Sequence, residues 1–263
     1  MSDYTAGVPE TPVEPLLLPL SESPRKRRPE ERVYAAIEIA ACSGVPTQLI
    51  LAYILTQAGF ALSPGQLSIS FVATLLLLDA VIVVGLVLFL LRLHGEHPRA
   101  VLLGQRPIVK EALIGLPLTI AVFGLVIIIL TATQYIAPWM HNVAKNPLEQ
   151  LIGSRRDATI FAVVATLAGG VREEVQRAFI LRRFDQYLGG VRVGLVISSL
   201  AFGAGHLLQG WDAALTTAVL GAFWGAVYLS RGSIVAPVVS HSGFNMAEIV
   251  LFMVWGVQAS TNR

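Results

Sequence analysis

The chain has 263 residues, of which 54% are hydrophobic and only 14% are charged, and its formal net charge is +2. Average soluble domains contain roughly 25% charged residues, so an ordinary soluble protein is excluded. The small net charge gives no reason to expect a nucleic-acid partner. A single cysteine, Cys42, excludes an internal disulfide framework. We therefore expect an all-α, polytopic membrane protein that is surrounded by membrane lipid.

Residues 1–32 differ from the rest of the chain. Prolines recur throughout this segment, and Arg25–Arg28 form a basic cluster near its end. Proline at this density prevents a regular helix, so we expect a disordered, proline-rich basic tail. The apolar run Leu16–Leu20 is short and broken by proline, and the basic residues follow it. A signal peptide has the opposite order, so no cleaved targeting sequence is predicted.

Long apolar runs begin after the tail. A helix needs about 20 apolar residues to cross the ~30 Å hydrocarbon core of a membrane. On this basis we expect about seven spanning helices, at residues 33–60, 66–93, 111–137, 157–182, 191–208, 212–230 and 234–257. The first contains Pro46, which predicts either a kink or a shortened outer end. The fifth is barely long enough to span.

The loops between these runs differ in charge. Basic residues gather in the tail, at Arg92–Lys110, at Arg182–Arg192 and at Arg231, whereas residues 57–66 carry no charge. Because basic loops stay on the cytoplasmic side, the N-terminus is expected in the cytoplasm and the C-terminus outside.

Polar residues interrupt three of the later apolar runs. The densest group is Arg172-Glu173-Glu174-Val175-Gln176-Arg177, and the others are His206 and the pair His241 and Asn245. A charge near the bilayer centre costs at least ~2.5–3.5 kcal/mol, so such residues usually face the bundle interior and have a function. With a rise of ~1.5 Å per residue, they all lie about 10–21 Å from the cytoplasmic ends of their helices. We therefore expect them to meet in one layer of the membrane.

These residue types suit hydrolysis of a peptide bond. A glutamate, Glu173 or Glu174, can take a proton from the attacking water with help from His206. The imidazole of His241 and the amide of Asn245 can stabilise the oxyanion. Arg177 lies at i+4 from Glu173 and at i+3 from Glu174, so it can pair with either one. One glutamate would then act while the other is held by the arginine.

At these positions the sequence resembles the CAAX protease and bacteriocin-processing (Abi) family of intramembrane proteases, which includes the CAAX prenyl endopeptidase. That family carries Glu-Glu-x-x-x-Arg, Phe-x-x-x-His and His-x-x-x-Asn motifs on separate helices. Phe202–His206 fits the second motif and His241–Asn245 fits the third. The resemblance covers about residues 145–250, so residues 33–140 are interpreted as N-terminal transmembrane helices and residues 141–258 as the catalytic core. It implies a multi-pass protein of the bacterial inner membrane.

The first motif departs from the family pattern. Only two residues separate Glu174 from Arg177, where the family has three. Aligning the arginine puts Glu173 in the place of the second glutamate and Arg172 in the place of the first. Aligning the glutamates puts Ala178 where the arginine should be. The arginine therefore fits Glu173 better than Glu174, and both glutamates stay candidates for the base.

The resemblance leaves the cofactor open. Family members have been described as metalloproteases, and here Glu173, Glu174, His206 and His241 would be the ligands of a divalent metal such as zinc. The same residues suit a mechanism that requires no cofactor. The substrate would be a membrane-associated protein or peptide, with a lipidated CAAX peptide as one option.

Two other functions compete with a protease. A catalytically weakened scaffold or immunity-type binding protein is favoured by the altered first motif. A solute or proton transporter would use intramembrane carboxylates, but the sequence lacks repeats. The remaining acidic residues Glu38, Asp79 and Glu248 are expected to pair with polar groups of neighbouring helices or to lie near a membrane surface. Gly221 and Gly225 are interpreted as sites of close helix packing.

Overall fold

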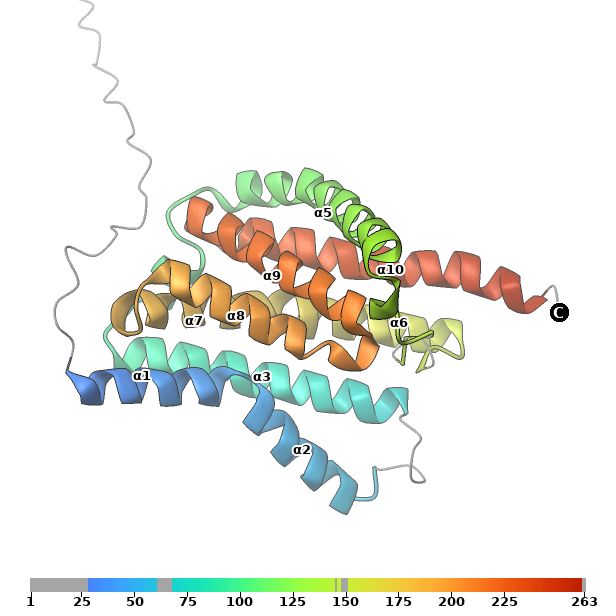
Figure 1. Ribbon diagram of the computed structural model, residues 1–263. Coiled ribbons are helices and arrows are strands. Elements are labelled where there is room, and N and C mark those ends of the chain that lie inside the picture. Colours follow the sequence, from blue (N-terminus) through green and yellow to red (C-terminus); the bar gives the residue numbers. More distant parts are fainter. Residues whose placement is uncertain (1–27, 61–67, 145, 148–150, 262–263) are drawn as a thin grey trace, which may run out of the picture.

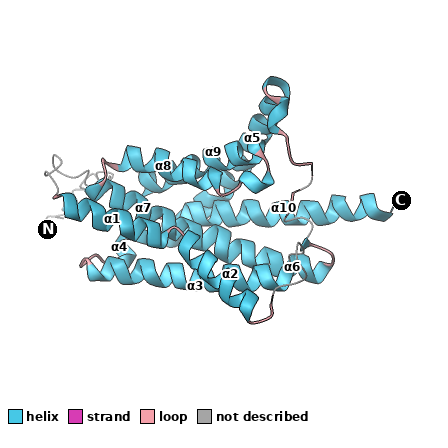
Figure 2. Ribbon diagram, turned by 60° about the horizontal axis from the view of Figure 1, so that its bottom comes forward, coloured by secondary structure: helices cyan, strands magenta, loops and turns pink. Residues whose placement is uncertain are grey.

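A computed structural model describes residues 28–60, 68–144, 146–147 and 151–261, with side chains described as far as Val254. The described residues are helical or loop, without a strand (Figure 2). The helices are α1 (Pro29–Cys42), α2 (Val45–Gln57), α3 (Ile69–Leu93), α4 (Pro98–Leu102), α5 (Ile108–Ile136), α6 (Arg155–Val164), α7 (Glu173–Tyr187), α8 (Val191–Ala204), α9 (Trp211–Arg231) and α10 (Val235–Thr261). Short 3-10 turns are η1 (Pro138–Met140) and η4 (Leu207–Gln209), and η3 (Ala165–Arg172) is a π-helix.

Successive helices run back and forth along one bundle axis, so the expected all-α polytopic architecture is confirmed (Figure 1). Among the described residues, fewer helices than the seven expected spans have the length and apolar composition of a span. Four helices, α3, α5, α9 and α10, are long and apolar enough to cross a membrane, and α1 with α2 make a fifth if that bent pair is one span. These helices are long and apolar enough for a bundle that spans a membrane.

Two of the seven predicted spans, residues 157–182 and 191–208, lack the continuous apolar length of a spanning helix, for different reasons. Residues 155–187 form one helical stretch, but the π-helix η3 and the ionisable run Arg172–Arg177 interrupt its apolar character. Helix α8 has 14 residues, which at 1.5 Å per residue is about 21 Å and shorter than the ~30 Å core. It ends at Ala204, so His206 lies in the turn beyond the helix rather than inside it.

The N-terminal boundary also needs correction. Helix α1 begins at Pro29, inside the segment expected to be disordered; residues 1–27 lie outside the described part of the chain. Proline suits the first helical position because its missing N–H would have no partner there. Glu30 and Glu31 in the first turn complement the helix dipole.

The kink expected at Pro46 is present. Helices α1 and α2 meet at an angle of 41°, and α2 turns away from the bundle (Figure 1). Gly44 lies at the break with φ 81°, a left-handed conformation that glycine adopts without strain. Pro46 stands in the first turn of α2, where it cannot continue α1.

Helix α10 lies at the centre of the later helices and packs on α5, α6, α9 and η3. Glycine allows the closest approaches. A Cβ atom at Gly115 of α5 would lie 2.6 Å from Cβ of Val239, and one at Gly225 of α9 would lie 2.4 Å from Cδ1 of Leu195. At Gly221 the corresponding distance to Cδ1 of Phe202 is 3.0 Å. Gly221 and Gly225 are therefore close-packing positions, as predicted.

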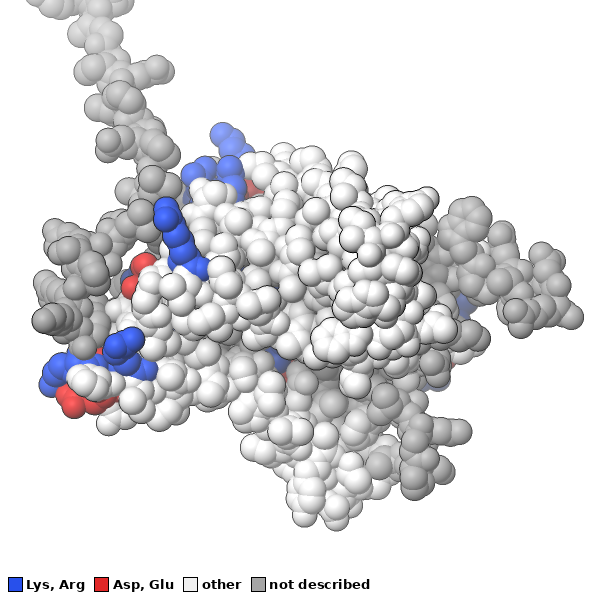
Figure 3. All heavy atoms as spheres, viewed as in Figure 1, with Lys and Arg blue, Asp and Glu red and all other residues white. Residues whose placement is uncertain are grey.

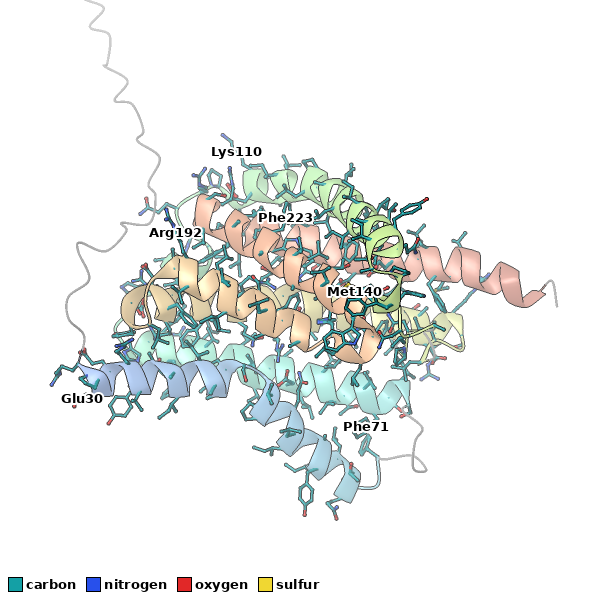
Figure 4. The ribbon with its side chains drawn as sticks, in the orientation of Figure 1. Glu30, Phe71, Lys110, Met140, Arg192 and Phe223 are labelled. Atoms are coloured by element: carbon teal, nitrogen blue, oxygen red, sulfur yellow. The ribbon has the colours of Figure 1, made fainter. Side chains whose placement is uncertain are left out.

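Most of the charged side chains that are visible lie at one end of the bundle, and the middle of the visible face is almost without charge (Figure 3). Glu30, Lys110 and Arg192 lie at that charged end, whereas Phe71 and Met140 lie toward the other (Figure 4). Basic residues of the predicted loops, such as Lys110 and Arg192, therefore lie together at one end of the bundle (Figure 4).

Candidate active site

The two glutamates stand at a change of helix type. Residues 165–172 form the π-helix η3, and α7 begins at Glu173. Short π-helical segments are rare and frequently occur at functional sites. Gly169 and Gly170 allow α10 to approach this segment, because a Cβ at Gly170 would lie 1.9 Å from the Ser242 hydroxyl oxygen. The π-helix therefore brings the start of α7 against the part of α10 that carries His241.

Glu174 is held from two sides. It is only 1% exposed, and its Oε1 accepts hydrogen bonds from Nη1 of Arg177 and, at 2.8 Å, from Nδ1 of His241. A buried carboxylate needs such partners, since an unpaired buried charge costs several kcal/mol. The arginine therefore pairs with Glu174, not with the glutamate that the motif spacing favoured. The second carboxylate oxygen of Glu174, Oε2, is buried without a hydrogen-bond partner among the described residues.

His241 is fixed by an aromatic neighbour as well. The indole of Trp224 on α9 stacks on the imidazole, with 3.7 Å between ring centroids and 14° between planes. Nε1 of Trp224 donates to Oγ of Ser240 at 3.2 Å, which anchors the indole to α10 itself. Because Nδ1 of His241 donates to Glu174, its Nε2 is left to face other groups.

Glu173 has a different environment from its neighbour. Its side chain is 22% exposed, and its Oε2 lies 3.8 Å from Nε2 of His241. This distance is too long for a direct hydrogen bond, but one water molecule can bridge two such groups. Glu173 is therefore the glutamate whose carboxylate is not committed to a close ion pair.

His206 joins the group through Phe202. Nδ1 of His206 donates to the backbone oxygen of Phe202 at 2.9 Å, which leaves Nε2 of a neutral imidazole as an acceptor. The Phe202 ring makes edge contacts with His206 and His241, at centroid distances of 5.1 and 6.3 Å. The guanidinium carbon of Arg177 lies 4.9 Å from the same ring. Phe202 thus connects both histidines with the arginine.

Asn245 faces the π-helix. Its Nδ2 donates to the backbone oxygen of Ala165 at 3.2 Å, and a Cβ at Gly169 would lie 2.6 Å from the same nitrogen. The amide therefore satisfies a carbonyl at the start of η3, and its second N–H stays available to another acceptor.

The residues do not fit a metal centre. Among the described residues, no group of three or more His, Cys, Asp or Glu side chains is arranged to hold a metal ion. The positively charged guanidinium of Arg177 pairs with Oε1 of Glu174 and disfavours a second cation beside it. Nδ1 of His241 donates to the same oxygen, so this ring nitrogen carries a proton and has no lone pair for a metal.

Residues 155–247, which include all of these side chains, match the family model described as type II CAAX prenyl endopeptidase Rce1-like. The chain carries an Rce1-like domain. Searches of curated proteins and of solved structures found no match. Rce1-like proteins are generally CAAX intramembrane proteases, which agrees with the family resemblance seen in the sequence.

Sequence reasoning missed parts of the surroundings of the Rce1-like site. The contact of Trp224 with His241 could not be predicted, because a tryptophan in an apolar run is typical of ordinary helix packing. Arg172 was noticed only as part of the charged run, and Asp79 was expected merely to pair with a neighbour; the two form an ion pair next to the site.

Proposed function

We propose that this protein is an intramembrane endopeptidase that hydrolyses a peptide bond of a membrane-associated protein or peptide, with a prenylated CAAX protein as the first substrate class to test. One observation carries the proposal. Glu174 is held between Arg177 and His241, while Glu173 stays partly exposed 3.8 Å from the same histidine. Such a pair of differently placed carboxylates supports acid–base chemistry.

In the proposed reaction, Glu173 is the general base. It takes a proton from a water molecule whose oxygen attacks the peptide carbonyl carbon, and it returns the proton to the leaving nitrogen. Nε2 of His206 accepts a hydrogen bond from the same water. Glu174 is a positioning residue that orients His241 and stabilises its protonated form. The Nε2–H of His241 and the second amide N–H of Asn245 donate to the oxyanion.

The test is cleavage of reporter peptides by the full chain purified in detergent, with a prenylated CAAX peptide and its unprenylated counterpart. We expect Glu173→Gln to lower kcat by about 10²–10⁴-fold, the usual contribution of a general base. Its melting temperature should hardly change because its side chain is partly exposed. Glu174→Gln, His206→Ala and His241→Ala should also lower cleavage.

Glu111→Gln is the matched control, because Glu111 is a buried, arginine-paired glutamate between α5 and α9. If the wild-type chain cleaves neither peptide, or if Glu173→Gln and Glu174→Gln cleave as fast as wild type, the protease proposal is wrong. Repeating the assay with a chelator and then with added zinc tests the metal dependence independently.

A binding protein without catalysis is the second candidate. It is favoured by the bond from the amide of Asn245 to the backbone oxygen of Ala165, which leaves at most one of the two amide N–H groups for an oxyanion. This candidate predicts that the peptides bind, with a measurable dissociation constant, and stay intact.

We further propose a bacterial inner-membrane location with the N-terminus in the cytoplasm. The charged end of the bundle supports this orientation (Figure 3). Labelling of Arg99→Cys and Trp139→Cys in intact cells by an impermeant thiol reagent should reach only Trp139→Cys. If Arg99→Cys is labelled and Trp139→Cys is not, the N-terminus lies outside the cytoplasm and the proposed orientation is wrong.

A further inference from the structure

A second buried ion pair lies directly beside the glutamates. Nη2 of Arg172 donates to Oδ2 of Asp79 at 2.5 Å, and the two residues are 6% and 1% exposed. Arg172 is the last residue of η3, and Asp79 lies in the middle of α3. The pair therefore ties the junction between η3 and α7 to a helix that lies outside the Rce1-like domain.

Helix α2 completes this cluster. Asp79 accepts hydrogen bonds from Oγ1 of Thr47 and, at 3.1 Å, from Nε2 of Gln48. The break between α1 and α2 makes room for the guanidinium, because a Cβ at Gly44 would lie 1.7 Å from Nη2 of Arg172. The kink at Gly44 therefore leaves room for the guanidinium. Asp79 of α3 binds the arginine, and Thr47 and Gln48 of α2 hold Asp79 in turn.

The π-helix is thereby fixed at both of its ends. At its start, Asn245 donates to the backbone oxygen of Ala165; at its end, Arg172 is bound to Asp79. A π-helix, with i→i+5 hydrogen bonds, and an α-helix have different numbers of residues per turn. The position of the boundary between them therefore sets the direction in which the following side chains point. The first two side chains after this boundary are Glu173 and Glu174.

We infer that Asp79 and Arg172 are positioning residues for the catalytic glutamates: they fix the point where η3 ends and α7 begins, and thereby aim Glu173 and Glu174 at His241. This inference rests on the proposed protease function. It also gives the helices outside the matched domain a part in the active site, since α2 and α3 supply the cluster that holds Arg172.

A role in stability alone predicts a different outcome. Replacing both members of a buried ion pair by apolar residues of similar size is often neutral or stabilising, whereas removing one member leaves an unpaired buried charge. The double variant Asp79→Leu/Arg172→Met therefore removes the anchor without that penalty. It separates positioning from folding.

We expect Asp79→Leu/Arg172→Met to fold with a melting temperature close to that of wild type. Its kcat on the reporter peptide should fall about 100-fold, the effect of a misplacement of about 1 Å at a reacting group, while KM changes less than about twofold. A second measurement does not depend on catalysis: the ¹⁵N NMR spectrum of protein labelled at histidine. The signal that is missing in His241→Ala identifies His241. We expect this signal to shift, because its partner Glu174 moves.

The matched control is Glu111→Leu/Arg231→Met. It removes a bidentate pair between buried Glu111 of α5 and partly exposed Arg231 of α9, and neither residue is bonded to Glu173 or Glu174 among the described residues. This control should leave both kcat and the His241 signal unchanged.

A folded Asp79→Leu/Arg172→Met protein with wild-type kcat and an unshifted His241 signal would overturn the inference, while the protease proposal would stand. Should that variant not fold, Asp79→Asn is the second test, with an expected tenfold loss of kcat at unchanged KM; wild-type kcat in Asp79→Asn overturns the inference equally. If wild-type protein cleaves nothing, the protease proposal fails, and the NMR signal of His241 alone decides the positioning role.

Discussion

Glu173 and Glu174 are adjacent in the chain, yet their carboxylates have different surroundings. Glu174 is buried between a guanidinium and an imidazole, whereas Glu173 keeps some exposure and a long contact to His241. Consecutive residues on a helix point about 100° apart, so only one of them can face α10 directly. In the proposed mechanism, this difference makes Glu174 the positioning carboxylate and Glu173 the general base.

Arg177 should therefore matter for stability as well as activity. Arg177→Gln leaves Glu174 buried with only His241 as a partner, and breaking a buried pair in this way costs roughly 3–5 kcal/mol. Chemical unfolding in detergent measures the loss. The double variant Arg177→Gln/Glu174→Gln should recover much of the stability and none of the activity. Equal stability of Arg177→Gln and wild type would mean that this ion pair is not formed.

At the scale of elements, the contact between η3 and α10 decides how the site is assembled. Gly170 and Ser242 meet so closely that a methyl group has no room between them, and Ser242 follows His241 directly. Packing at this point therefore sets the position of the imidazole relative to α7. The same close approach places the amide of Asn245 on the carbonyl of Ala165.

Gly170→Ala should push α10 away from η3. A Cβ there would lie 2.9 Å from Cβ of Ser242 and 3.1 Å from its backbone Cα, so the backbone has to shift. Overpacking of this kind costs about 1–3 kcal/mol, and displacement of His241 should lower kcat at least tenfold. The loss is measured by thermal unfolding and by the cleavage assay.

Two further variants identify the cause of that loss. Ser242→Gly in the Gly170→Ala background makes room for the methyl group and should restore part of both properties. Gly85→Ala on α3 is the control, because its Cβ would meet nothing within 4 Å. If Gly170→Ala behaves like Gly85→Ala, close packing at η3 is not required.

At the scale of the whole molecule, one network at the charged end connects helices that are distant in sequence. Arg183 of α7 is fully buried; its Nε donates to Glu38 of α1 at 2.7 Å and its Nη1 to Glu96 at 2.5 Å. Glu96, in the segment between α3 and α4, also accepts from Nε of Arg182 at 2.7 Å. The expectation that Glu38 pairs with neighbouring polar groups is thus confirmed.

This network should make stability depend on pH. Burial raises the pKa of Glu96, but the hydrogen bonds and charges of Arg183 and Arg182 outweigh burial and hold the pKa below its usual range. A carboxyl group with a lowered pKa in the folded state stabilises the fold above its unfolded pKa, and this contribution is lost as the pH falls through the folded pKa. The melting temperature should therefore drop on acidification below about pH 5.

Glu96→Gln tests the origin of this pH dependence. The variant should be less stable than wild type at pH 7, and its melting temperature should change less between pH 7 and pH 4. Glu30→Gln serves as the control, since Glu30 is exposed and pairs only with exposed Arg28 in the described residues. An equally steep acid transition in Glu96→Gln and wild type would assign the pH dependence to other groups.

Much of this molecule follows from the order of its residues. The apolar runs predicted the helices. In a membrane the backbone N–H and C=O groups find no water, and a helix satisfies them with its own hydrogen bonds. The kink at Pro46 and the close packing at Gly221 and Gly225 also follow locally, from ring sterics and from the missing side chain. The three motifs predicted that Glu173, Glu174, His206, His241 and Asn245 belong together, since charged and polar groups avoid lipid.

Only the tertiary structure decided how these groups pair. From the sequence, Arg177 is within reach of both glutamates, at i+4 and i+3 along the helix. The choice depends on how α7 is rotated about its axis. In the folded chain it follows the π-helix η3 with Glu174 facing His241 of α10, a helix distant in sequence. The pair of Asp79 and Arg172 likewise joins residues far apart in the chain. Local spacing determines which residues are available, and the packing of α10 and α3 on η3 determines which of them meet.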